Sequence, residues 1–180
     1  AVHQQTQRTY AIGDNEAGNH ALVLFDANLQ AIATVEDTGD FPEDADYDVY
    51  EPIRDLAVHG DQVIVLSTTH HANGSGLRLL DLDGIFLRTI AAGQFLKHPQ
   101  AVAVSHGRAF VIEDDDEDID VELKGNVLYV IDIQSGDIMQ RVRIDLQGEA
   151  SEILVDGDEI YIADYGFGRV VVLQFAGSEA

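Results

Sequence analysis

Two clusters of closely spaced aspartates are the residues of this chain whose types and spacing best suit chemistry. Each has the pattern D-x-D-x-D, formed by Asp44, Asp46 and Asp48 and by Asp114, Asp116 and Asp118. Ca²⁺ takes about six to eight oxygen ligands, which clustered carboxylates supply. An EF-hand loop has glycine at its sixth position, but Val49 and Ile119 stand there. The clusters therefore indicate a different kind of site for Ca²⁺ or a basic partner, or else a solvated run of charge.

The composition excludes several classes of function. The 180 residues include 33 acidic and 10 basic side chains, a formal net charge of −23, and no cysteine. Nucleic acids and anionic membranes bind basic surfaces, so neither is an expected partner. No apolar run approaches the roughly 20 residues of a membrane span, so we expect no membrane insertion. Thiol catalysis and cysteine-ligated zinc are excluded outright.

Most basic residues of the chain are arginines. Only Lys97 and Lys124 are lysines, and the other basic residues are arginines. A surface with many aspartates and few lysines resembles that of proteins from salt-loving organisms. The alternative interpretation is ordinary acidic loops. The composition does not fix the compartment, for which our expectation is an extracytoplasmic one, whether secreted, periplasmic or at the cell surface.

The elements that must position these residues are short β-strands in a repeating pattern. About 14 runs rich in valine, isoleucine, leucine and aromatic residues are separated by glycine, asparagine and aspartate. Residues 53–67, 99–114 and 150–164 each form a strand, a tight turn with glycine and a second strand. Their turn glycines recur at intervals of 47 and 50 residues. A period of about 40–50 residues with four strands per repeat is typical of β-propeller blades.

The sequence therefore predicts an all-β fold, a β-propeller with blades of four antiparallel strands. We expect one domain over 1–180, with blade boundaries near 1–50, 51–97, 98–148 and 149–180. The first blade lacks a convincing inner strand and the last lacks its outer strand, which gives about three and a half blades. An incomplete ring leaves open strand edges. It can be completed by a second copy, by the N-terminal segment, or by another polypeptide.

The repeats resemble a known family. The segments AIGDNEAGNHALVLFD (11–26), HPQAVAV (98–104) and YIADYGFGRVVVLQF (161–175) are similar to strands of NHL-type repeats. That resemblance implies architecture more than activity, because NHL-type and related six-bladed propellers include protein- and RNA-binding modules, lyases and calcium-dependent lactonases. In lactonase-like propellers one metal lies on acidic side chains at the channel mouth. Asp55 and Glu152 are the positions here that match.

One face of the propeller is expected to carry the function. With strands named a to d outward from the axis, all a–b and c–d turns are tight. The long connections at 36–52, 68–76 and 113–125 all fall on the opposite face, where binding residues usually lie. Beyond the aspartates, the candidate binding residues on this face are His70, His71, His98, Tyr47, Tyr50, Tyr165 and Phe167.

The leading interpretation is a non-catalytic binding or assembly module that presents this acidic loop face. It would engage a protein, or a ligand bridged by a cation such as Ca²⁺, and associate through its open edges. One alternative is a calcium-dependent hydrolase, lactonase or lyase with its metal on Asp55 and Glu152. Another is a structural subunit of a filament or surface assembly. No nucleophile or phosphate-binding motif favours an enzyme.

Overall fold

The computed structural model describes residues 1–14, 20–35, 53–67, 76–91, 98–115, 125–146 and 148–175. Every element in these ranges is a β-strand except one short 3₁₀ turn, η1 (Tyr165–Phe167). The strands are β1 (Val2–His3), β2 (Arg8–Asp14), β3 (His20–Phe25), β4 (Ala31–Val35), β5 (Ile53–His59), β6 (Gln62–Ser67), β7 (Gly76–Asp81), β8 (Phe86–Ile90), β9 (Pro99–Ser105), β10 (Arg108–Asp115), β11 (Gly125–Asp132), β12 (Ile138–Arg143), β13 (Ala150–Asp156), β14 (Glu159–Asp164) and β15 (Arg169–Gln174).

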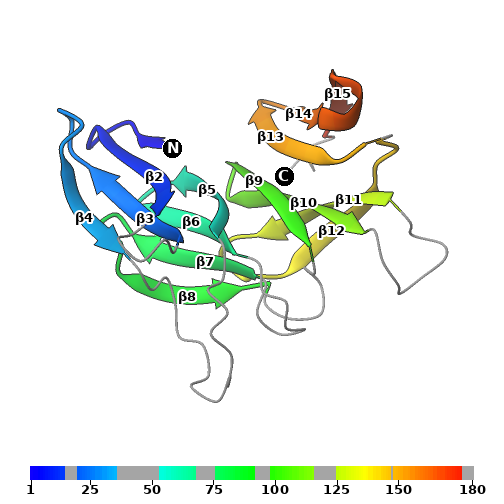
Figure 1. Cartoon of the computed structure of the whole chain (residues 1–180). Helices are drawn as coiled ribbons and strands as arrows, with labels where there is room; N and C mark the ends of the chain where they lie inside the picture. The colour runs from blue at the N-terminus through cyan, green and yellow to red at the C-terminus, as the bar shows by residue number, and fades with distance from the viewer. Residues whose placement is uncertain are drawn as a thin grey trace, which may run out of the picture. The chain divides into compact units, whose positions relative to one another are not determined.

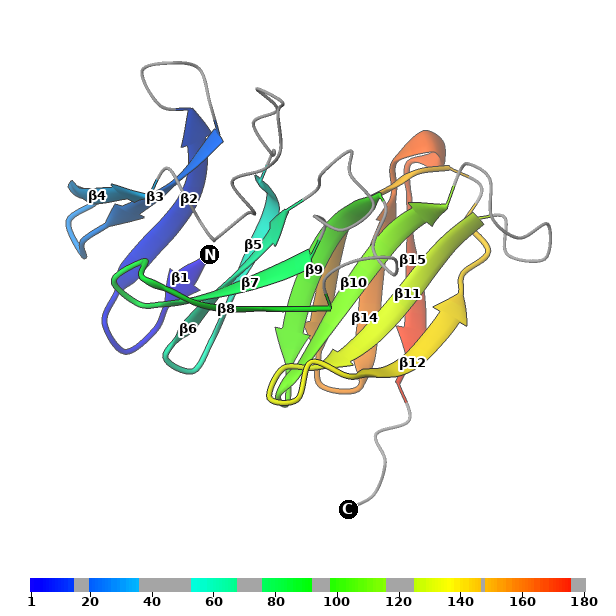
Figure 2. The same cartoon turned by 90° about the horizontal axis from the view of Figure 1, so that it is seen from below.

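These strands form four antiparallel sheets in chain order (Figures 1 and 2). Three sheets have four strands, β1-β2-β3-β4, β5-β6-β7-β8 and β9-β10-β11-β12, and the last has three, β13-β14-β15. The predicted fold class is confirmed: the chain is all-β and its sheets are the blades of an incomplete propeller. The last blade lacks a fourth strand among the described residues, as predicted.

The first blade differs from the prediction, because it has an inner strand. β1 pairs with β2 through Val2↔Thr9 and His3↔Arg8. The Tyr10 N–H also donates to the Ala1 carbonyl at 2.8 Å. A strand of two residues has no alternating pattern that a sequence can reveal. Its pairing is set by the turn at residues 4–7, where Thr6 donates its N–H to His3 Nδ1 at 3.2 Å.

The blades group into two compact units, residues 1–97 and 98–180, and each unit has its own core. The core of unit 1 combines residues of the first two blades, namely Tyr10, Leu22, Leu24, Ile53, Leu56, Val63, Val65 and Leu80. The core of unit 2 combines residues of the last two blades, namely Ala101, Ala103, Phe110, Ile112, Leu128, Val130, Ile144, Ala150, Ile153, Ile160 and Ile162. In each unit, therefore, the apolar faces of two blades pack together.

Tight turns close one end of every blade, and aspartates stabilise the c–d turns. Asp26 Oδ1 accepts N–H bonds from Asn28 at 2.8 Å and Gln30 at 2.9 Å. Asp81 Oδ1 accepts in the same way from Asp83 and Ile85, and Asp132 Oδ1 from Ser135. Short side chains that bond to their own backbone favour such turns. The b–c connections leave the blades at the opposite end, between partners such as Ser67 and Gly76.

Candidate functional site

The turn between β14 and β15 presents two large aromatic side chains to solvent. Tyr165 is 78% exposed and Phe167 is 57% exposed. They belong to η1, the b–c connection of the last blade, so they lie at the loop end of unit 2. Of the candidate binding residues, these two are the aromatics that the structure describes. Exposed aromatic faces can stack on a flat ligand group or a cation.

An ion pair at the base of this turn ties its two ends together. The Asp164 carboxylate, whose side chain is fully buried, accepts a hydrogen bond at 2.8 Å from Arg169 Nε. The Arg169 guanidinium carbon lies 5.9 Å from the centre of the Phe167 ring. Gly168 closes the turn in the left-handed region, with φ of 58° and its N–H bonded to the Tyr165 carbonyl. The turn that carries the two aromatic side chains is thus held by the Asp164–Arg169 ion pair and by the hydrogen bond from Gly168.

Close packing against the segment before β13 holds the turn from below. A Cβ built on Gly148 would lie 2.7 Å from Asp164 Oδ1 and 2.8 Å from Gly166 Cα. The Tyr165 N–H donates to the Glu149 carbonyl at 3.0 Å. Asn126 Nδ2, at the start of β11, donates to the Gly148 carbonyl at 3.1 Å. The ends of the third and fourth blades therefore meet beside the aromatic turn.

The acidic connection of the third blade begins and ends near this turn. Asp114 pairs with Asn126 and Asp115 pairs with Gly125, so β10 and β11 stay paired up to residues 115 and 125. Asn126 is also the residue that bonds to Gly148. The remaining candidates on the long connections lie outside the described residues: Asp44, Asp46, Tyr47, Asp48, Tyr50, His70, His71, Asp116 and Asp118.

Asp55 and Glu152 occupy equivalent positions in two different blades. Asp55 pairs with Leu66 and Glu152 with Ala163, each directly after a register shift at the start of the inner strand. Asp55 Oδ1 accepts the N–H of the next residue, Leu56, at 2.7 Å, and Glu152 is exposed. The two carboxylates belong to separate compact units, and a metal held by both stays a prediction.

His98 is exposed just before β9. Its backbone N–H donates to Oε1 of the buried Glu113 at 3.1 Å. The interaction is made by the backbone, so it fixes where β9 begins. The imidazole does not take part in this hydrogen bond.

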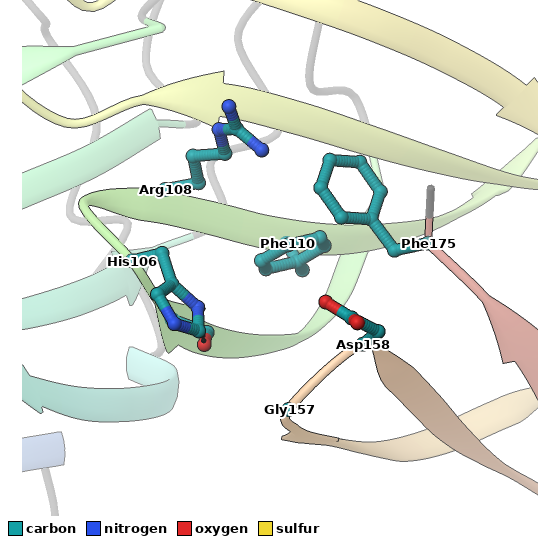
Figure 3. A pocket seen from close by; sticks show the side chains of 7 residues that line it. His106, Arg108, Phe110, Gly157, Asp158 and Phe175 are labelled. Carbon is teal, nitrogen blue, oxygen red and sulfur yellow. Dashed lines mark hydrogen bonds between the residues drawn. The ribbon is translucent and has the colours of Figure 1, made fainter. Parts of the chain in front are cut away.

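Unit 2 also contains a small hollow that the sequence did not suggest. Its volume is about 190 Å³, below the roughly 300–1,000 Å³ of typical ligand pockets. Figure 3 shows the side chains around it, which come from the turns after β9 and β13 and from β10 and the residue after β15. The lining residues are Ser105, His106, Arg108, Phe110, Gly157, Asp158 and Phe175.

The polar groups of this hollow mostly support the fold. His106 has φ of 50°, as a turn residue, and its Nδ1 lies 2.8 Å from Ser105 Oγ. The Arg108 guanidinium lies 5.1 Å from the centre of the Phe175 ring. The pKa of Asp132 is lowered chiefly by the Ser135 N–H and in part by the charge of Arg108. Several of these residues stand beside the repeated turn glycines, but that pattern marks the turns and gives no sign of a hollow.

Within the described ranges, no three histidine, aspartate or glutamate side chains form a group suited to a metal ion. In the same ranges, no helix has the length and hydropathy needed to cross a membrane.

Comparison with known proteins gives information on the fold but not on the function. No family model matches the chain, and no curated protein matches it. Among solved structures, the computationally designed Ika4 protein is similar over 93% of this chain and 86% of its own, with 13% identity and a TM-score of 0.54. Hydrazine synthase of Kuenenia stuttgartiensis is similar over 97% of this chain, with 14% identity and a TM-score of 0.68. The chain spans about half (51%) of that protein's chain. Such likenesses show a shared fold alone.

Proposed function

We propose that this chain is a non-catalytic binding and assembly module whose loop face binds a basic, arginine-rich segment of another protein. The observation that supports this most is the exposed pair Tyr165 and Phe167 on a turn closed by an ion pair and glycine packing. A preformed aromatic surface loses little entropy when it binds. The resemblance to NHL-type repeats belongs to the same proposal, because that family includes protein-binding modules.

The charge of the chain supports a cationic partner. The net charge is −23, and the connection between β10 and β11 holds a dense run of carboxylates close in sequence to Asn126. Asn126 bonds to Gly148, which packs under the aromatic turn. An arginine side chain can stack on an aromatic ring while neighbouring carboxylates attract its charge. Ca²⁺ is the second cation we propose for the Asp114–Asp118 cluster, since carboxylate oxygens are its preferred ligands.

A fluorescent nona-arginine peptide provides a direct test by anisotropy titration at about 0.15 M salt, where distant charges are screened. Each exposed cation–π contact contributes about 0.5–1 kcal/mol. The double variant Tyr165→Ala/Phe167→Ala should therefore bind about 5–30-fold more weakly. The matched control is Leu29→Ala/Ile85→Ala, two exposed aliphatic residues at the turn end of the blades in unit 1.

The control should bind the peptide as the wild type does. If the aromatic double variant also binds unchanged, the acidic surface attracts the peptide without using the turn. That result would refute the proposed site.

A further inference from the structure

Within the part of the chain that the structure describes, the last blade leaves one of its two faces uncovered. Across its strands, Leu154 pairs with Tyr161 and Tyr161 with Val172, while Ala163 pairs with Val170. Paired residues share a face, and this one is opposite the face that packs in the core of unit 2. Leu154 and Val170 are each 60% exposed, and Val172 is 51% exposed. We call these five residues the leading face, and the same pairing places the exposed Glu152 beside Ala163 on this side of the sheet.

The third blade shows what such a face normally does. The positions equivalent to the leading face there are held by Ala103, Phe110, Ile112, Leu128 and Val130. All five are buried in the core of unit 2, against the fourth blade. In the third blade, therefore, the equivalent face packs against the facing side of the next blade. β15 also contains the aliphatic run VVVL, which suits a covered strand, yet none of its residues is buried.

Among the described residues, the first blade leaves the complementary face uncovered. Ala11 pairs with Val23 and Val23 with Thr34, and Thr9 pairs with Phe25. These five residues, the trailing face, lie opposite the face that packs on the second blade, and none is buried. None of them is charged, in a chain of net charge −23. Small residues such as Ala11 and Thr9 can accommodate the larger Leu154 and Val172, as interdigitating layers require.

We propose that the leading face binds the trailing face of a second copy of this chain, and that two chains join through two such contacts. The inference deepens the assembly part of the proposed function and rests on it. It needs no new type of contact, because both units already pack one blade on the next.

The size of the faces requires both contacts. Strands rise about 3.3 Å per residue and lie about 4.8 Å apart, so three strands of six residues cover roughly 280 Å². A stable pair buries about 800 Å² of accessible surface per partner, which one face of this size does not provide. Each chain has two such faces, and projecting side chains make the accessible surface of each larger than its flat area. Together the two faces approach that value. Disrupting either face should therefore separate the chains.

Size exclusion with light scattering tests this with four proteins. The wild type should have twice the 19.6 kDa chain mass. Val172→Lys on the leading face and Val23→Lys on the trailing face should each give a single-chain mass. Met139→Lys, at an exposed residue of β12 outside both faces, should keep the wild-type mass. Val23 is half-buried, so Val23→Lys can fail to fold. In that case Thr34→Lys, at an exposed residue of the same face, replaces it.

Mixing the two disrupted variants restores only one intact contact per pair, which is too small to hold two chains, so the mixture should keep the single-chain mass. A wild type of single-chain mass would overturn the inference. Loss of the larger mass in Val172→Lys alone would also overturn it, since two last blades would then be pairing with each other. Peptide binding at Tyr165 and Phe167 is measured separately, so either proposal can fail while the other holds.

Discussion

Replacing Gly148 by alanine tests whether glycine packing holds the aromatic turn. The new Cβ would lie 2.7 Å from Asp164 Oδ1, 2.8 Å from Gly166 Cα and 2.9 Å from Gly166 N. Two of these atoms are backbone, so the turn itself must move. Overpacking of this kind costs about 1–3 kcal/mol. At about 2–4 °C per kcal/mol for a chain of this size, the melting temperature should fall by about 2–12 °C.

Two further glycines make this a graded series. A Cβ on Gly166 would lie 3.1 Å from Gly148 Cα, so Gly166→Ala should lower the melting temperature less than Gly148→Ala. A Cβ on Gly13 would meet Val23 Cγ2 at 3.4 Å, an ordinary contact. Gly13→Ala should leave the melting temperature unchanged or raise it slightly, since alanine suits a strand interior better than glycine.

Calorimetry gives the melting temperatures, and hydrogen exchange at the Tyr165 amide reports on the turn. That amide donates to the Glu149 carbonyl, so displacement of the turn should speed its exchange in Gly148→Ala. Nona-arginine binding should weaken as well, although both aromatic rings remain. If Gly148→Ala has the same melting temperature as Gly13→Ala and its Tyr165 amide exchanges as slowly as in the wild type, the reasoning about the turn is wrong.

Two further predictions concern the acidic residues. The pKa values of Asp26 and Asp132 are lowered mainly by backbone N–H groups of their own turns, so the stability they contribute is present above about pH 4 and is lost as the pH falls through the lowered values. Between pH 6 and pH 2 the wild type should therefore lose more melting temperature than Asp26→Asn/Asp132→Asn, and parallel curves would contradict this. The triple change of Asp114, Asp116 and Asp118 to asparagine should abolish Ca²⁺ binding by calorimetry and weaken nona-arginine binding without lowering the strand content. Unchanged binding of both probes would remove this connection from the proposed site.

The strands could be predicted because their signals are local. The turn glycines at Gly60, Gly107 and Gly157 all have positive φ and stand where the repeat placed them. Alternating aliphatic residues then set which side chains enter the cores. β1 was missed because two residues carry no period, and its pairing depends on contacts with β2 that only the folded chain makes.

The candidate site was predicted in part. Tyr165 and Phe167 were placed on the loop face because strand directions alternate, which needs no knowledge of packing. Their support could not be foreseen, because the approach of Gly148 to Gly166 joins segments whose spacing has no pattern in the sequence. The hollow beside His106 was missed for a similar reason. Its lining residues come from two blades and lie side by side only when those blades pack.

The aspartates of the c–d turns also limit how this surface can be redesigned. Removing acidic residues is a common route to crystals or to weaker repulsion between copies, and the chain offers 33 of them. Asp26, Asp81 and Asp132 are unsuitable choices, because each accepts the N–H bonds that shape its turn. Asp145, which is exposed after β12, is a better candidate. Net charge and fold can be adjusted independently only if these turn residues are kept.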